Sequence, residues 1–296
     1  MIRLQMNRWL SAICLLLVLG SHSFTSAKTS VTVLDFGQTE LAKTVAEKVR
    51  SSLRAKREFL VADGDLSRSA AMGVGYKGSL NLTVNDARDL GAALATEFYL
   101  LGDAQILRRS SSTRSVYYES YCSFFLVNSR TGNLLVWERP VFDGDEATGV
   151  LQTLYHHVEH ELTPRLVVAL RRAAEDEQLQ RTAIVSYAGP VIEEAPEDEK
   201  TAEAQGLRLP RPFKRLRPEY PASAERAEAE GTVDVLVEVG ADGEVGGVHI
   251  VRWAGFGLDE ATVTTVKQMH FFPAMRNGTA IPMRVLLRYN FRKPSR

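Results

Sequence analysis

The sequence predicts two domains of different fold class: an α/β domain with a mixed sheet and helices, then a smaller α+β domain with a three-stranded antiparallel sheet. The chain has 296 residues, which is enough for two domains of roughly 100–200 residues each. Short β-rich segments alternate with helical patterns over residues 28–177, as in layered α/β folds. Residues 178–206 are acidic and contain proline, which predicts a linker before a compact unit at residues 207–296.

The α/β domain is expected to follow the order β-α-β-α-β-β-β-α. Its predicted strands are 31–36, 59–61, 98–107, 116–127 and 134–138, and its predicted helices are 38–56, 86–94 and 148–177. The first helix is indicated by Leu41, Val45 and Val49, which recur at helical spacing. A turn at residues 129–133 makes the last two strands a hairpin. Pro164 is expected to kink or split the final helix, because proline cannot donate a helical hydrogen bond.

The second unit is expected to follow the order α-β-β-α-β. Its predicted elements are a helix at 222–230, strands at 232–239 and 245–253, a helix at 258–269 and a strand at 282–291. In the last strand, positions 285, 287 and 289 share one face, and positions 286, 288 and 290 share the other. No later strand follows, so we expect the outer edge of residues 283–291 to carry unpaired backbone donors and acceptors.

Composition excludes several classes of protein. Hydrophobic residues make up 45% and charged residues 24%, which argues against disorder along the whole chain and against a polytopic membrane protein. The 36 basic residues balance 36 acidic ones, so no nucleic-acid partner is predicted. Of the 2 cysteines, Cys14 lies in the N-terminal apolar run and Cys122 in a predicted buried strand. Neither a disulfide framework nor a cysteine-based zinc site is therefore expected.

The first 27 residues have the features of a secretory signal peptide. Arg3 and Arg8 precede an apolar run at residues 9–20, and residues 25–27 fit the small-x-small cleavage pattern. The run is shorter than the roughly 20 apolar residues that a membrane span needs. We therefore expect a periplasmic protein whose mature chain begins near Lys28. The alternative is an uncleaved anchor that holds the protein in the inner membrane, facing the periplasm.

Few side chains suggest chemistry. His156 and His160 share a helix face near Glu159 and Glu161, but a solvated face is favoured over a metal site. The glycine-rich residues 73–79 lack the ending of a phosphate-binding loop and predict a plain loop. No enzyme, catalytic residue, cofactor or metal is therefore predicted.

Three other side chains are interpreted structurally. Asp35 is interpreted as a turn or cap residue. Trp253 and Phe256 are expected to pack in a core, with a binding anchor as the alternative.

Several short motifs mark residues 207–296. They are Tyr220-Pro221 with Ala224, Gly231-Thr-Val-Asp-Val, Asp242-Gly243-Glu-Val, Gly255-Phe-Gly-Leu-Asp259, Phe272-Pro-Ala274, Asn277-Gly278 and the closing strand to Phe291. With this pattern the region resembles the TonB C-terminal domain family. The resemblance implies a domain that takes an extended segment of an outer-membrane receptor onto its sheet edge. The partner-binding residues it implies are Arg217, Tyr220, Pro221, Arg284, Leu286, Arg288 and Asn290.

A second set of motifs lies in the first domain. They are Val33-Leu-Asp-Phe36, Leu90-Gly-Ala92 leading to Phe98-Tyr-Leu-Leu-Gly102, and the stretch from Val127 through Thr131-Gly132 to Trp137. Residues 30–172 thereby resemble the CsgG, FlgO and TolB-N group of envelope α/β domains. This resemblance implies a non-enzymatic role in secretion, assembly or envelope-spanning complexes.

The two resemblances together predict a TonB-like periplasmic protein. We expect it to bind an outer-membrane receptor or transport complex by β-strand addition, in a system of the energy-transduction or transmembrane-transport type. The alternative is a structural or assembly component of an envelope complex, whose N-terminal domain forms a homo-oligomer. On either view the partners are envelope proteins, and membrane contact is indirect unless residues 1–27 are retained.

Overall fold

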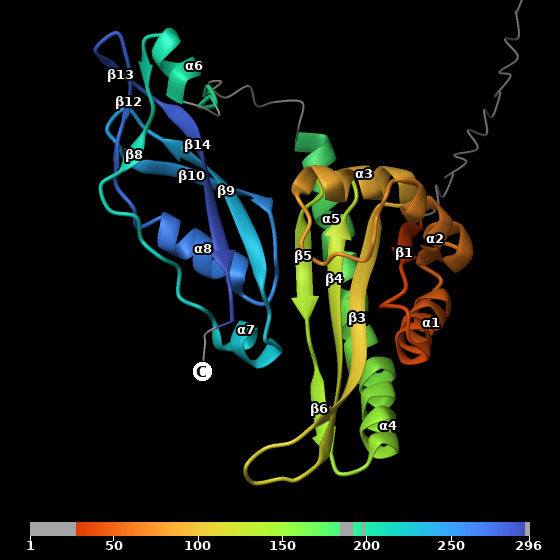
Figure 1. The fold of residues 1–296 in the computed structure, drawn as a ribbon. Coiled ribbons are helices and arrows are strands. Elements are labelled where there is room, and N and C mark those ends of the chain that lie inside the picture. Colours follow the sequence, from red (N-terminus) through yellow and green to blue (C-terminus); the bar gives the residue numbers. More distant parts are fainter. Residues whose placement is uncertain (1–27, 184–191, 197–198, 294–296) are drawn as a thin grey trace, which may run out of the picture.

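In the computed structural model, residues 28–183, 192–196 and 199–293 are described, and they form an α/β domain followed by a smaller α+β domain (Figure 1). The predicted signal peptide at 1–27 lies outside these residues, as does part of the predicted linker. In the ranges just named, no helix has both the length and the apolar character that a membrane crossing requires.

The N-terminal domain is built on one mixed sheet. Its strands are β1 (Thr29–Val33), β2 (Phe59–Val61), β3 (Phe98–Arg109), β4 (Tyr117–Asn128), β5 (Leu134–Glu138) and β6 (Val141–Gly144). The order is β2-β1-β3-β4-β5, with β6 also paired to β4. β1 runs parallel to β2 and β3, whereas β4 pairs antiparallel with β3, β5 and β6. The predicted mixed sheet is therefore confirmed, and β6 is an addition to it.

Helices cover both faces of this sheet. They are α1 (Glu40–Arg54), α2 (Gly64–Gly73), α3 (Val84–Leu94), α4 (Ala147–His157) and α5 (Thr163–Ala183). The central strands are apolar on both faces, so each face needs a cover. Phe124 and Leu126 pack with α1, α4 and α5, whereas Phe125 and Val127 pack with α2 and α3. Cys122, expected in a buried strand, lies fully buried in β4.

Helix α2 was not predicted. It is preceded by Asp63, whose carboxylate accepts hydrogen bonds from the backbone N–H groups of Asp65 and Leu66 and so caps the helix. Only Ser67 and Ala71 of this helix are buried, so its apolar periodicity is weak. The sequence pattern therefore indicated only the turn before the helix and the loop after it.

The long helix is split before Pro164, as predicted. A π-helical turn, η1 (Val158–Leu162), joins α4 to α5. Within it, the backbone N–H of Thr163 bonds to the carbonyl of Val158, and the Thr163 hydroxyl donates to the same oxygen at 2.7 Å. The extra residue in this turn accommodates a proline that has no N–H and whose ring would clash with a regular helical carbonyl. Helix α5 then continues to Ala183, past the predicted end at residue 177.

Glu177 ties α5 to the end of β4. Its side chain is 4% exposed and accepts hydrogen bonds from Asn128 at 2.9 Å and from Arg181 at 3.0 Å. Arg130 also donates to it, with its Nη2 at 3.0 Å. The hydrogen bond from Arg130 is the main reason that the pKa of Glu177 is lowered to about 2. An ionised Glu177 therefore stabilises the folded state.

We expect this stabilisation to depend on pH. Because the pKa of Glu177 is depressed on folding, its contribution is full above the unfolded pKa, about 4.3, and disappears as the pH falls towards 2. Glu177→Gln should lower the free energy of unfolding by about 1–3 kcal/mol at pH 7 and by much less at pH 2. Urea unfolding of both proteins at the two pH values measures this. Equal losses at pH 7 and pH 2 would contradict it.

The C-terminal domain has the predicted α-β-β-α-β order. Its elements are α7 (Ala222–Ala227), β9 (Gly231–Val239), β10 (Val245–Arg252), α8 (Leu258–Val266) and β14 (Met283–Phe291). The three strands form an antiparallel sheet in the order β10-β9-β14, which confirms the predicted fold class. The alternate residues Val233, Val235 and Val237 of β9 are buried in the core that includes Leu258 and Val266 of α8.

Short elements extend this domain. They are α6 (Glu199–Ala204), β7 (Leu207–Arg208), β8 (Arg211–Pro212), β11 (Phe271–Phe272), β12 (Ala274–Arg276) and β13 (Thr279–Ile281). β8 pairs with β11, and β12 pairs with both β7 and β13. Part of the predicted linker, residues 199–206, thus lies in α6 and the turn that leads to β7.

The two domains are in contact through Trp253. The indole is 1% exposed and stacks on Phe125 of β4, with ring centroids 6.0 Å apart. Its Nε1 donates to the carbonyl of Gly132 at 3.0 Å. The Asn81 amide donates to the carbonyls of Trp253 and Thr232 at 2.6 and 2.8 Å. Core packing of Trp253 is therefore confirmed, but the core in question is shared by the two domains.

Candidate functional site

Strand β14 has one edge paired to β9 and one edge facing away from the sheet. In an antiparallel pair, alternate residues turn their backbone groups towards the neighbour and the rest turn them outward. Arg284 bonds outward, because its N–H donates to the carbonyl of Glu193 and its carbonyl accepts from the N–H of Ala195. By the same period, Leu286, Arg288 and Asn290 present their N–H and C=O groups to the outer edge.

Two arginines of β14 are engaged across the open face of the sheet. Arg284 donates through Nε to Glu238 of β9 at 2.9 Å. Arg288 donates to both oxygens of Asp234 at 2.8 and 2.9 Å, and Arg252 of β10 also reaches Asp234. Burial alone would raise the pKa of Asp234, but the hydrogen bonds from Arg288 and Arg252 outweigh this effect and hold the pKa below its usual value. These ion pairs join side chains of β14 to β9 and β10 and do not use the outward backbone groups of Leu286 and Asn290.

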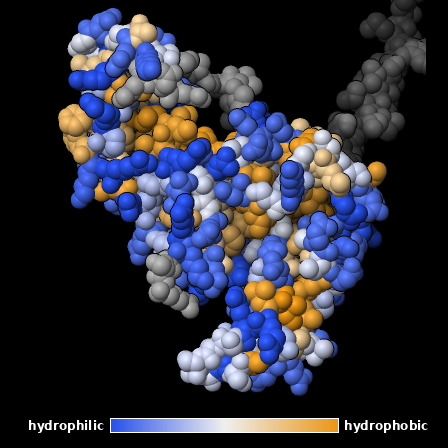
Figure 2. All heavy atoms as spheres, viewed as in Figure 1, coloured by the Kyte–Doolittle hydropathy of each residue, from blue (hydrophilic) through white to orange (hydrophobic). Residues whose placement is uncertain are grey.

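The outer edge carries hydrophobic as well as basic groups. Leu286 is 52% exposed between the two paired arginines. Arg215, two residues before the predicted Arg217, donates to the carbonyl of Arg288 at 3.0 Å and lies over the Tyr289 ring. Figure 2 shows hydrophobic residues on the surface of the C-terminal domain and where the two domains meet, within a mostly hydrophilic surface.

The other predicted partner-binding residues have different environments. The Tyr220 hydroxyl donates to the carbonyl of Ala229 at 2.7 Å, and its ring packs beside Phe291. Pro221 is the residue that precedes helix α7. These contacts give Tyr220 and Pro221 a role in shaping the domain, whereas Arg217 is exposed. The partner-binding role of all seven residues remains a prediction.

Sequence analysis missed three contributors to this edge: Arg215, Arg276 and residues 193–195. The acidic run around Glu193 and the basic run at 208–217 suggested a mutual attraction, but Glu193 pairs with Arg276, which lies outside the basic run. Arg215 and residues 193–195 contact backbone atoms of β14, and such contacts leave no trace in side-chain patterns.

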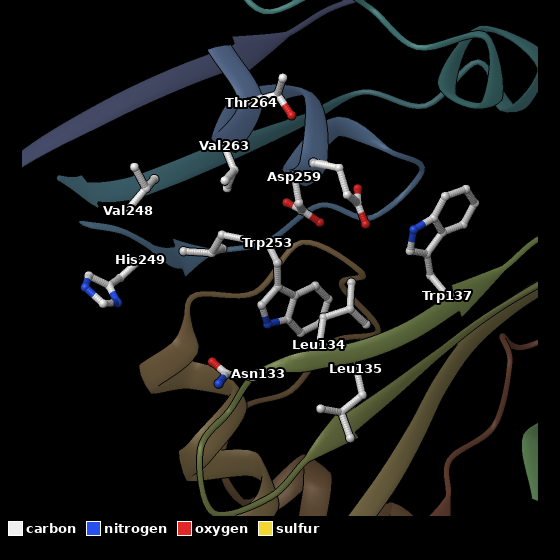
Figure 3. Close-up of a pocket in the computed structure, with 12 residues that line it drawn as sticks. Asn133, Leu134, Leu135, Trp137, Val248, His249, Trp253, Asp259, Val263 and Thr264 are labelled. Carbon is white, nitrogen blue, oxygen red and sulfur yellow. The ribbon is translucent and has the colours of Figure 1, made fainter. Parts of the chain in front are cut away.

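A pocket of about 670 Å³ lies between the domains (Figure 3). Residues of β5, including Leu134 and Trp137, line one side, and residues of β10 and α8 line the other. Asp259 of α8 accepts hydrogen bonds from the backbone N–H groups of Ala254 and Gly255 at 2.9 and 2.7 Å. Burial raises the pKa of this carboxyl to about 6. Its oxygens hold the loop before α8, as expected for an acidic residue at a helix start.

The histidines of the long helix and Asp35 lie away from the β14 edge. His156 and His160 lie side by side with their rings tilted by 45° and the ring centroids 4.4 Å apart. Across residues 28–183, 192–196 and 199–293, no group of three or more His, Cys, Asp or Glu side chains is arranged to hold a metal ion. Asp35 was interpreted as a turn or cap residue, but it forms ion pairs with Arg50 at 2.6 Å and Arg68 at 2.7 Å.

The C-terminal domain is a three-stranded antiparallel sheet with β14 at one edge, packed against helices α7 and α8. Residues 217–292 match the family model described as Gram-negative bacterial TonB protein C-terminal. The predicted TonB-like nature of the C-terminal domain is thus confirmed, and it indicates a TonB-like protein of the cell envelope. The type of the N-terminal domain remains a prediction.

Solved structures with detectable similarity come from several bacteria. The TonB C-terminal domain of Pseudomonas aeruginosa is 20% identical, with 29% of this chain and 89% of that chain covered and a TM-score of 0.25. A hypothetical protein from Chlamydia trachomatis is 12% identical, with 46% and 96% covered and a TM-score of 0.33. A lipoprotein from Neisseria meningitidis is 13% identical, with 46% and 99% covered and a TM-score of 0.32. No curated protein sequence matches the chain significantly.

Proposed function

We propose that this is a periplasmic protein that binds an outer-membrane receptor or transport complex by adding a partner strand to the outer edge of β14. The proposal extends to a role in transport systems of the energy-transduction type. The observation that supports it best is the row of outward backbone groups from Leu286 to Asn290, on a strand that pairs with β9 along its other edge and is joined to it by ion pairs. Main-chain hydrogen bonds supply affinity in this mode of binding, and nearby side chains supply register.

Leu286→Pro tests the edge directly. The N–H of Leu286 points outward, so proline there removes a donor for the partner without breaking a bond to β9. Arg288 is a poorer site, because its side chain also holds Asp234. Losing the ladder bond that this N–H donates, at about 0.5–1.5 kcal/mol, should weaken partner binding by about 2–13-fold. Cross-linking and capture of envelope partners by the full chain measures this, once circular dichroism has established that the variant is folded.

The matched control is Leu286→Ala, which shortens the same side chain and keeps the backbone donor. We expect it to retain most of the binding. If folded Pro and Ala variants capture partners equally well, strand addition at β14 is wrong, and the surface around Arg217 and Tyr220 becomes the better candidate. The molecular mass of the native protein in solution tests the alternative of an assembly component. A large closed oligomer would favour an N-terminal domain that builds a complex.

A further inference from the structure

The outer edge of β14 is already occupied at one end by the chain itself. Residues 193–195 lie beside Arg284 in a parallel bridge, with Glu194 opposite Arg284. The N–H of Arg284 donates to the carbonyl of Glu193, and the N–H of Ala195 donates to the carbonyl of Arg284, both at 2.8 Å. This short segment therefore bonds to β14 as the first residues of an added strand would.

Side chains as well as backbone recognise this segment. Both carboxylate oxygens of Glu193 accept from Nη2 of Arg276 at 2.9 Å. Two residues later, Ala195 packs against a small buried cluster made by Ala202, Leu207, Ala274 and Met283. In an extended segment, residues two apart point to the same side. The edge thus offers one cationic group and one small apolar site at the spacing of alternate strand residues.

The segment is held by few interactions. Two backbone hydrogen bonds, the packing of Ala195 and one exposed ion pair attach it, and Arg276 and Glu193 are 39% and 50% exposed. Such an exposed pair contributes little in water. A longer strand that also bonds to Leu286, Arg288 and Asn290 forms more ladder bonds than residues 193–195 do. Displacing the segment is therefore favourable for a partner that covers the whole edge.

We propose that residues 193–195 are a built-in ligand that occupies the start of the β14 edge and is displaced by a partner segment of the same chemistry. That partner is an extended peptide that runs parallel to β14, with a carboxylate side chain followed two residues later by a small apolar one. The inference rests on the proposed function, because it assumes that the edge receives a strand. It adds the direction and side-chain pattern of that strand, and a competitor within the chain.

Two proline variants of the full-length chain distinguish an occupied edge from a free one. Ala195→Pro removes the N–H that donates to Arg284 and so releases the segment. Glu194→Pro is the matched control, because the bonds to β14 come from residues 193 and 195 and the N–H of residue 194 points away. The probe is a fluorescent synthetic peptide with the sequence of residues 190–197 of this chain.

We expect the peptide to bind Ala195→Pro at least about tenfold more tightly than it binds the wild-type chain or Glu194→Pro. A tethered competitor acts at an effective concentration in the millimolar range, which a free peptide must overcome. Hydrogen exchange at the Arg284 amide should be slow in the wild type, faster in Ala195→Pro, and slow again when the peptide is added. A peptide with Arg in place of Glu193 should bind severalfold more weakly, because like charges then face each other, and Arg276→Glu in the Ala195→Pro chain should recover this loss.

Equal peptide binding by all three chains would overturn the built-in ligand. If Leu286→Pro still captured partners more weakly than Leu286→Ala in that case, strand addition at β14 would stand without the built-in ligand. Peptide binding by none of the chains would also overturn the inference, because the side-chain pattern would then be wrong. The proposed function is judged separately, by the capture of envelope partners with the Leu286 variants.

Discussion

Trp253→Ala should lower the free energy of unfolding by about 3–5 kcal/mol and weaken the contact between the two domains. The indole is almost fully buried, stacks on Phe125 and donates to the carbonyl of Gly132. Truncation to alanine leaves a cavity between the domains and an unpaired buried carbonyl. Urea unfolding followed by circular dichroism measures the loss. Limited proteolysis should also show faster cleavage between residues 178 and 206 than in the wild type.

The control is Trp253→Phe, which keeps an aromatic ring on Phe125 but removes the N–H donor. It should cost about 1–3 kcal/mol, since a buried acceptor loses its partner while most of the packing remains. If the alanine variant is as stable as the wild type and is cleaved at the same rate, the contact through Trp253 contributes nothing to stability. The domains would then behave as independent units.

Gly255→Ala should destabilise the protein by about 2–4 kcal/mol. Gly255 has a φ of +73°, in the left-handed region that alanine adopts only at a cost. An added Cβ would also collide with the ring of Phe125, which is fully buried. Overpacking of this kind forces side chains out of their rotamers or shifts the backbone. Thermal and urea unfolding of the variant measure the combined effect.

Gly278→Ala separates the two causes. Gly278 has a φ of +83°, but an added Cβ there meets no atom within 4 Å. Its substitution should therefore cost only the backbone strain, about 1–2 kcal/mol. If Gly255→Ala and Gly278→Ala lower the free energy of unfolding equally, the ring of Phe125 moves aside without measurable destabilisation. The interface between the domains would then be looser than its contacts indicate.

Local patterns predicted most of the secondary structure, and the failures have local causes. Helix α1 was found because its apolar residues recur at helical spacing along a strongly amphipathic segment. Helix α2 was missed because almost none of it is buried, so no apolar stripe marks it. Strand β6 was missed because it is short and follows Pro140, and its pairing with β4 supplies the stability that its own sequence does not.

For the candidate site too, local patterns predicted one part, and contacts between distant residues decided the other. The alternation in β14 correctly placed Leu286, Arg288 and Asn290 opposite the buried Leu287 and Tyr289, because side-chain period follows from strand geometry alone. The partners of Arg284 and Arg288 on β9 depend on register, which the sequence of β14 does not specify.

By itself, the sequence determined the two fold classes, the two faces of the last strand and the TonB-like character of residues 207–296, of which 217–292 match the family model, because these follow from local periodicity and short motifs. The tertiary structure alone decided that Trp253 closes a core against Phe125, and that residues 193–195 bond to the edge of β14. Contacts between residues far apart in the chain depend on how whole elements pack. Backbone hydrogen bonds to an edge strand use groups that nearly every residue carries, so no side-chain pattern marks them in advance.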